Sequence, residues 1–303
     1  MQPMIIDRDE TTILNHAGWR DDYFSLWRYR VEERTEEHLD WPGRPFSLHP
    51  ARDRIHVTMV ERSDDGAHRV TIRPIAEIET VLASATHQDN VWTFDGPRDL
   101  WNLAPPYVVV DGGKLLHIDP NDADLDPLVW YEQGYDLNYQ GLGPAYPIPD
   151  SHLLLIAIQR DSRPVVYDPV MREVLGHIAL AERRGNPTLY FREDAPELWA
   201  DDYDTLLRLR VPTWEVLDAV EVQQAEGGMR KFIGSFWFPP DESFCVVARP
   251  FSGDAAIIDP ESFAVVRTVS LPEQPIDAVT ARGEMIARDW QTRRLLRARL
   301  DMS

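Results

Sequence analysis

A hydrophobic unit that recurs about every 46 residues constrains this chain more than any other feature. In each unit an apolar segment runs into a turn that contains proline, and a second apolar segment follows. The turn prolines are Pro74, Pro120, Pro169, Pro212 and Pro260, at spacings of 46, 49, 43 and 48 residues. A near-constant period of this size predicts one supersecondary unit per repeat, packed side by side along the chain.

Each repeat also contains two earlier strands. PFSLHPARDRIHVTMV, AYPIPDSHLLLIAIQR and FWFPPDESFCVVARPF each read as a short apolar strand, a turn with proline, and a longer strand. In the longer strand of the first, Ile55, Val57 and Met59 alternate with polar residues, as expected where one face of a strand is buried. The segments RSDDGAH, VDGGK, RDSR and PFSGD that follow are typical of tight hairpins. The unit is therefore predicted to be four antiparallel strands, one blade of an all-β propeller.

Two segments carry a family resemblance. VVARPFSGDAAIIDPESFAVVRTVSL and YVVVDGGKLLHIDP resemble the YVTN type of repeat found in WD40-like β-propeller proteins. The resemblance spans roughly residues 43 to 303 and implies a fold, with no particular function attached. The chain has neither the Gly-His start nor the Trp-Asp end of a WD40 repeat, so the hydrogen-bond network of those repeats is not expected.

The number of blades depends on the two ends of the chain. The tail EMIARDWQTRRLLRARL ends before a fourth strand, and PMIID near the N-terminus is expected to complete that blade and close the ring. One period before Pro74 predicts a hairpin near residue 28, where YFSLWRYRVEE alternates. The alternative is six blades with an N-terminal cap, in which Asp21 and Asp22 begin a short helix through Phe24 and Trp27. We expect a single seven-bladed domain over residues 1–303, with blades near 9–42, 43–85, 86–132, 133–181, 182–224, 225–271, and 272–303 with 3–7.

Composition restricts the partners. The chain has 51 acidic and 31 basic residues, a net charge of −20, whereas binding to nucleic acid or to an anionic membrane needs clustered cations. We therefore expect no nucleic-acid or membrane partner. Cys245 is the single cysteine, so no intramolecular disulfide can form. The first residues lack a basic segment followed by an apolar one, and the longest apolar run, LLLIAI, is too short for a membrane span. These features predict a cytoplasmic protein.

The connections between blades are the expected location of a functional site. In a propeller these connections and the central hairpin turn of each blade lie on one face, and long loops on a rigid scaffold often carry function. Here the connections are long and mix aromatic with charged residues, which is typical of contact surfaces. The residues expected to bind a ligand or partner are Trp92, Asp95, Arg98, Trp101, Tyr135, Tyr139, Tyr146, Arg230 and Trp237. These rings could equally pack the spaces between blades, above all Trp237, which begins an inner strand.

We expect no metal or cofactor. Asp122, Asp124 and Asp126 begin like a calcium loop, but Pro127 stands where that loop needs glycine and Gln133 where it needs glutamate. The acidic turn WADDYDT is expected to face water. The nine histidines show no ligand spacing, and Cys245 lies in an alternating strand, which favours a buried, inert thiol.

Two functions remain open from the sequence. The first is a non-catalytic scaffold that binds a protein or peptide, with a small molecule as a further possible ligand, at the loop face. The second is a small-molecule enzyme, of the hydrolase, lyase or cyclase type, at the mouth of the central channel. For the enzyme, the general acid or base candidates in the loops are His87, Asp95, Glu132 and Asp136. A propeller site gathers one residue from each of several blades, so a missing local motif does not decide between the two.

Overall fold

The structure is a computed structural model of the whole chain. It describes residues 4–6, 12–17, 25–39, 44–51, 54–62, 68–74, 79–81, 83–87, 92–93, 107–111, 114–118, 128–129, 142–158, 164–168, 171, 173–180, 188–192, 194–222, 232–292 and 294–300.

The first four sheets of the described residues contain four strands each, and their strands follow in chain order. The first sheet is β1 (Ile5–Ile6), β2 (Thr12–Ala17), β3 (Ser25–Arg30) and β4 (Thr35–Leu39). The second is β5 (Arg44–Ala51), β6 (Arg54–Arg62), β7 (His68–Pro74) and β8 (Ala83–His87). The third is β9 (Trp92–Thr93), β10 (Tyr107–Asp111), β11 (Lys114–Ile118) and β12 (Leu128–Val129). The fourth is β13 (Leu142–Pro147), β14 (Leu154–Ile158), β15 (Val165–Asp168) and β16 (Glu173–His177).

Three more sheets complete the described residues. The fifth is β17 (Leu189–Phe191), β18 (Glu197–Asp202), β19 (Thr205–Arg210) and β20 (Glu215–Glu221). The sixth is β21 (Phe236–Trp237), β22 (Cys245–Arg249), β23 (Asp254–Asp259) and β24 (Ala264–Ser270). The last has three strands, which are β25 (Pro275–Ala281), β26 (Glu284–Asp289) and β27 (Leu295–Arg299).

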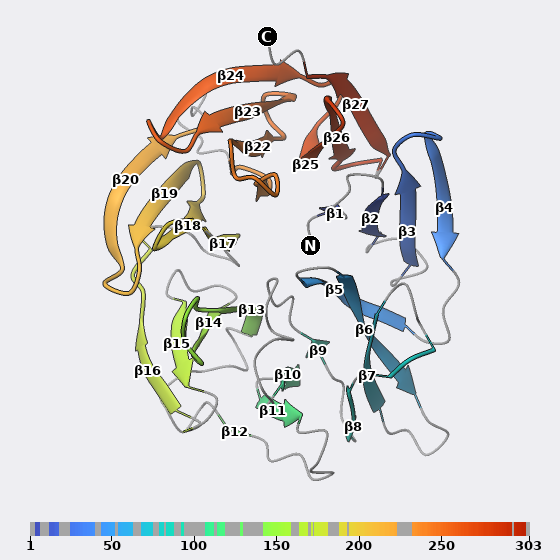
Figure 1. Ribbon diagram of the computed structural model, residues 1–303, viewed down its shortest axis with the longest axis vertical. Helices are drawn as coiled ribbons and strands as arrows, with labels where there is room; N and C mark the ends of the chain where they lie inside the picture. Colours follow the sequence, from blue (N-terminus) through green and yellow to red (C-terminus); the bar gives the residue numbers. More distant parts are fainter. Residues whose placement is uncertain are drawn as a thin grey trace.

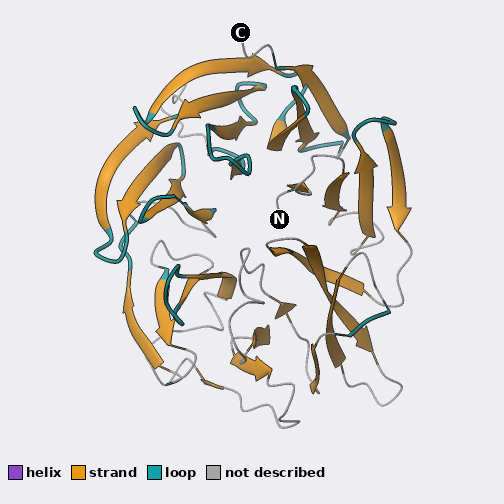
Figure 2. Ribbon diagram, in the orientation of Figure 1, coloured by secondary structure: helices purple, strands orange, loops and turns teal. Residues whose placement is uncertain are grey.

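Every sheet is an antiparallel meander in which each strand pairs with the next strand of the chain. Figure 1 shows the sheets placed around a common centre in chain order, and Figure 2 shows strands and loops throughout the described residues. The prediction of an all-β fold made of antiparallel sheets is confirmed. Within the same residues, no helix reaches the length and apolarity that a membrane span requires.

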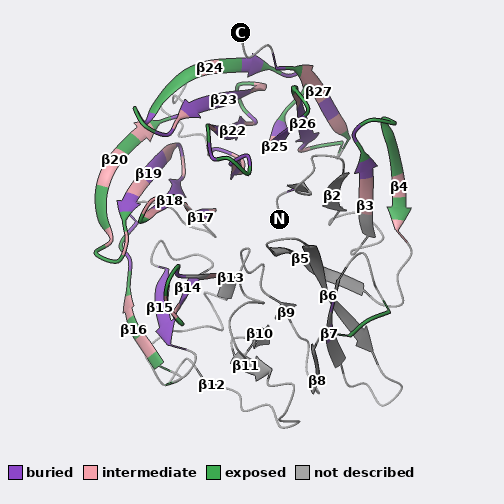
Figure 3. Ribbon diagram, viewed as in Figure 1, coloured by how far each residue is buried: buried purple, intermediate pink, exposed green. Residues whose placement is uncertain are grey.

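Hydrophobic layers between neighbouring sheets form the core. Strands β22, β23 and β26 are buried almost from end to end because a sheet packs on each of their faces, whereas the outer strands β20 and β24 carry exposed residues (Figure 3). One cluster joins the fifth and sixth sheets, around Trp199 and Phe238. A second joins the sixth and last sheets, around Val246 and Met285. The fifth, sixth and last sheets therefore each pack against both neighbouring sheets.

The N-terminal region forms a sheet of its own. The hairpin expected near residue 28 is present, with β3 and β4 joined by a turn at 31–34. The alternative of a helix through Trp27 is wrong, since Trp27 lies in β3 and pairs with Asn15 and His38.

The expectation that the segment PMIID completes the last sheet is wrong. Ile5 and Ile6 pair with Leu14 and Ile13 of β2, so this strand is the first strand of the first sheet. The physical reason is proximity in the chain. β2 follows β1 after a short connection, so pairing these two strands closes a far smaller loop than pairing β1 with β27 would. Met4 nevertheless packs on the last sheet, in a cluster that lies between the two ends of the chain.

Candidate functional site

The two ends of each sheet carry different turns. In an antiparallel meander, successive turns alternate between the ends, so the turn between the second and third strands lies opposite the other two turns. In the fifth, sixth and last sheets this central turn is 203–204, 250–253 and 290–292, and all three lie at the same end as the loop 232–235 that enters β21. The backbone N–H of Ile233 donates to the Tyr203 carbonyl at 2.7 Å, which joins two of these segments. We call this end the central-turn face.

Four aromatic rings meet on the central-turn face, and we call them the aromatic cluster: Tyr203, Phe232, Phe251 and Trp290. Phe232 is at the middle, with its ring centroid 5.0 Å from that of Phe251, 5.1 Å from that of Trp290 and 6.4 Å from that of Tyr203. All three contacts are edge to face, the arrangement that aromatic quadrupoles favour. Phe251 is 42% exposed, so the cluster presents apolar surface to solvent.

A close backbone approach positions Phe232. Ser235 donates its N–H to the Ile276 carbonyl at 2.8 Å, and Gly234 donates to the Ala248 carbonyl at the same distance. A Cβ at Gly234 would lie 2.1 Å from the Ile276 carbonyl oxygen, so only glycine permits this contact between the loop and β25. The loop is thus attached to two sheets just after Phe232, which fixes the ring at the centre of the cluster.

Asp289 holds the turn that carries Trp290. Its carboxylate accepts hydrogen bonds from the Thr292 N–H at 2.5 Å, the Thr292 hydroxyl at 2.7 Å and the Gln274 N–H at 3.0 Å. Burial alone raises the pKa of Asp289, but the hydrogen bonds from Thr292 and Gln274 outweigh it and hold the pKa below its usual value. The ionised carboxylate therefore stabilises this turn and its connection to β25.

An ion pair braces the neighbouring turn. Arg249 and Asp254 stand opposite each other at the ends of β22 and β23, and the guanidinium donates to both carboxylate oxygens, at 2.7 and 2.5 Å. The same guanidinium donates to the Val222 carbonyl at 3.0 Å, which ties the turn to the fifth sheet. A two-point contact of this kind restricts both side chains, so Phe251 is carried on a rigid turn.

Buried carboxylates lie beside the cluster. Asp201, Asp202 and Asp204 are 0%, 4% and 5% exposed, so the expectation that this acidic turn faces water is wrong. Asp201 accepts a hydrogen bond from the Thr188 N–H, and the Asp204 carboxylate accepts one from the Thr205 hydroxyl at 3.1 Å. For one oxygen of Asp201 and one of Asp204, a donor of the protein thus takes the place of water. Across the described residues, no group of three or more His, Cys, Asp or Glu is arranged to hold a metal ion.

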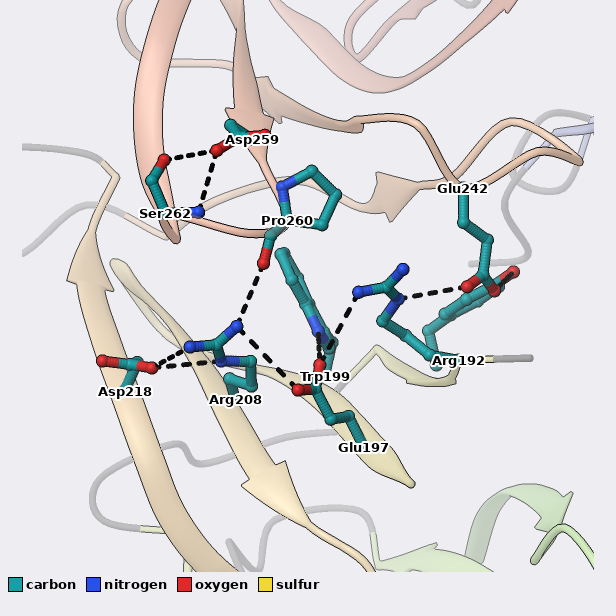
Figure 4. Close-up of polar contacts among 10 residues, drawn as sticks. Arg192, Glu197, Trp199, Arg208, Asp218, Glu242, Asp259, Pro260 and Ser262 are labelled. Atoms are coloured by element: carbon teal, nitrogen blue, oxygen red, sulfur yellow. Dashed lines mark hydrogen bonds and ion pairs between the residues drawn. The ribbon is translucent and has the colours of Figure 1, made fainter. Parts of the chain in front are cut away.

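Ionic contacts join the fifth and sixth sheets near their other end, whose turns include 194–196, 239–244 and 260–263. We call this end the ionic face (Figure 4). Arg192 donates to Glu242 at 3.1 Å, and the Tyr190 hydroxyl donates to the same carboxylate at 2.9 Å. Arg208 pairs with Asp218 of its own sheet and donates to the Pro260 carbonyl of the next sheet at 3.0 Å. Cross-sheet contacts of this kind fix one sheet against the next.

Cys245 is fully buried, and burial raises the pKa of its thiol well above the usual range. A thiol in this state is a poor nucleophile. The prediction that Cys245 is buried is confirmed, and its inertness stays a prediction.

Most of the residues that the sequence singled out lie outside the described residues: Asp95, Arg98, Trp101, Glu132, Tyr135, Asp136, Tyr139 and Arg230. Trp92 is in β9, and His87 ends β8, where it pairs with His68 instead of standing in a loop. Tyr146 packs against the cluster between the fourth and fifth sheets, and Trp237 packs against two clusters around the last sheet. Both rings therefore fill space between sheets, and a binding role for them stays a prediction.

None of the four rings of the aromatic cluster was selected from the sequence. The predicted site residues lie mostly in the long connections between repeats, whereas Tyr203, Phe251 and Trp290 stand in short central turns. The sequence carried a signal, because Tyr203 and Trp290 directly follow the second strand of their repeats and Phe251 follows it after Pro250. Phe232 follows Arg230 by two positions and carries no signal of its own.

The meander order of the sheets and their placement around a common centre define a β-propeller of the WD40-like kind. Among solved structures, the chain is similar to the Cps50 (Swd1) β-propeller domain of Myceliophteria thermophila, with a TM-score of 0.67 and 13% sequence identity. The match covers 98% of this chain and 96% of that one, so it establishes the fold over the whole length. No family model matches the chain, and no curated protein matches it.

Proposed function

We propose that the chain is a seven-bladed propeller whose first and last blades pack directly, without a shared strand. Each sheet of the described residues would be one blade. Met4 and Tyr29 pack with Val279 and Ile286 across the two ends of the chain. Arg34 pairs with Glu284 at 2.9 Å, which adds an ionic contact over the same boundary. These contacts support closure by side-chain packing.

We propose that the protein is a non-catalytic scaffold that binds a protein or peptide partner through its central-turn face. The observation that carries this proposal is the aromatic cluster. Rings from three successive sheets converge there, and the ring of Phe251 is left partly exposed on a turn that Arg249 and Asp254 hold rigid. Large rigid rings bury much apolar area on binding at a low entropy cost, which is why they dominate binding energy at interfaces.

Site-specific crosslinking tests this function. A photoreactive phenylalanine analogue at position 251 should give a defined crosslinked protein adduct in cells. The control carries the analogue at Met171, which is also exposed but lies in the turn at the opposite end of its sheet. Equal adducts from the two positions would contradict the proposal.

The purified partner then permits a quantitative test. Phe251→Ser should weaken its binding by about tenfold or more, since a central aromatic residue contributes about 1.4 kcal/mol or more to an interface. Val266→Ser, on the exposed outer strand β24, should leave the affinity unchanged. A partner that binds Phe251→Ser as tightly as the unmodified protein would place the binding surface elsewhere.

A further inference from the structure

The last sheet has an open edge. In the part of the chain that the structure describes, each of the other sheets has four strands, while the last sheet ends at β27. Figure 1 shows β27 at the rim of the molecule, between the outer strands β24 and β4. No described residue pairs with the side of β27 that faces away from β26.

The register shows which backbone groups the edge presents. Leu300 donates its N–H to the Gly283 carbonyl, and the Arg294 carbonyl accepts from the Asp289 N–H, both at 2.9 Å. Antiparallel pairs alternate, so the even-numbered residues of this segment bond to β26, while Leu295, Arg297 and Arg299 turn their N–H and C=O groups to the open side. The edge therefore offers three donors and three acceptors in the spacing of a strand.

Packing on both faces holds this edge in place. Leu296 and Leu300 are buried against the sixth sheet. On the other face Leu295 packs toward the first sheet, and the Arg297 guanidinium lies 5.7 Å from the centroid of the Tyr29 ring. A strand anchored on both faces is a preformed template, so a pairing segment would meet little cost in ordering it.

The charge along the edge selects the occupant. Arg294 and Arg299 are exposed and stand just before β27 and at its end, in a protein whose net charge is −20. Arg297 is already paired with Glu284, so Arg294 and Arg299 set the charge that the edge presents. A second copy of the chain would bring the same arginines to the edge, which disfavours it. An extended segment with acidic side chains would instead meet opposite charge at both ends.

We propose that the open edge of β27 binds an extended acidic segment of a partner protein, which becomes the fourth strand of the last sheet. The main-chain groups of Leu295, Arg297 and Arg299 would form the ladder, and Arg294 and Arg299 would contact the acidic side chains. This is recognition by strand addition. It is independent of the aromatic cluster, which lies on the central-turn face.

The test uses the full chain and a short fluorescent peptide in which glutamate alternates with valine. We expect the peptide to bind and to slow hydrogen exchange at the amides of Leu295, Arg297 and Arg299. A peptide with lysine in place of glutamate should bind about tenfold more weakly or not at all, since like charges would then face each other. Equal binding of the two peptides, no binding at millimolar concentration, or protection of other amides would overturn the proposal.

A pair of variants separates the contribution of side-chain charge to peptide binding from that of the main-chain hydrogen bonds. Arg299→Ala removes one charge and should weaken binding a few-fold, with less effect at high salt. Arg299→Pro also removes an outward N–H without touching the bonds to β26, and should weaken binding about tenfold further, as expected for one lost backbone hydrogen bond. These three amides could already be protected from exchange in the free protein. Protection that does not change on dilution would mean that the chain itself covers the edge, and protection that rises with concentration would mean that a second copy does. Either result overturns the proposal.

Discussion

The central-turn face and the ionic face hold the same sheets together by different chemistry. On the ionic face, the Glu242 side chain is 1% exposed and receives hydrogen bonds from Arg192 and Tyr190, so its charge is satisfied inside the protein. On the central-turn face, rings meet edge to face and Phe251 still exposes 42% of its surface. The contacts of the ionic face therefore serve to hold the sheets together. The central-turn face leaves part of the Phe251 ring exposed after folding, which supports the proposed binding role.

Two tryptophans show the same difference. Trp199 is completely buried between the fifth and sixth sheets, with its ring edge to face against Phe238 and Phe263 at 4.8 and 4.6 Å. Trp290 is half-buried at the surface of the aromatic cluster. One residue type therefore serves packing in one place and a surface in the other, and burial rather than residue type separates the roles.

The largest effect is expected from Trp199. Trp199→Ala should lower the free energy of unfolding by about 4 kcal/mol, because it leaves a cavity between two sheets. Trp290→Ala should cost less than half as much, since the ring is partly exposed. Urea unfolding followed by circular dichroism measures both. Equal losses would remove the distinction between the two regions.

Glu242 comes next. Glu242→Ala removes the nearer of two carboxylate partners of Arg192, which is itself largely buried, and should cost about 3 kcal/mol of stability. Glu261→Ala changes an exposed residue of a nearby turn and should cost less than about 0.5 kcal/mol in the same urea titration. A small loss for Glu242→Ala would show that the ionic face contributes little to holding the sheets.

Asp289 adds a pH dependence to the central-turn face. Its pKa is lowered in the folded protein, so its contribution to stability is present above the unfolded pKa of about 4 and is lost as the pH falls through the folded pKa. Asp289→Asn should therefore cost about 1 kcal/mol at neutral pH. The difference from the unmodified protein should shrink below about pH 4. Unfolding measured from neutral to acidic pH checks this, and a difference that stays constant with pH would exclude the carboxylate as its source.

An equally small effect on stability is expected at Phe251. Phe251→Ala should cost about 1 kcal/mol, the contribution of an edge-to-face contact. Phe263→Ala, in the same sheet but beneath Trp199 on the ionic face, should cost about 3 kcal/mol. Partner binding should show the opposite order, with the Phe251 variant more affected than the Phe263 variant. Equal loss of binding in the two variants would mean that binding depends on the integrity of the whole fold and not on the aromatic cluster.

Much of the fold could be predicted because the repeat is local in the chain. The turns with Pro212 and Pro260 both join the third and fourth strands of their sheets, as the repeat requires. The hairpin at 31–34 follows from extending the same period toward the N-terminus. The site was harder to predict, because Tyr203, Phe251 and Trp290 belong to three repeats and form no motif along the chain.

The sequence by itself determined that the chain folds as antiparallel four-strand units, because strand periodicity and turn chemistry depend on residues close in the chain. Only the tertiary structure decided that Ile5 and Ile6 pair with β2, that Asp201 and Asp202 are buried, and that Phe232 joins rings from three sheets. Pairing and burial depend on which distant segments pack together, and the contact of Gly234 with Ile276 shows how closely that packing is fitted.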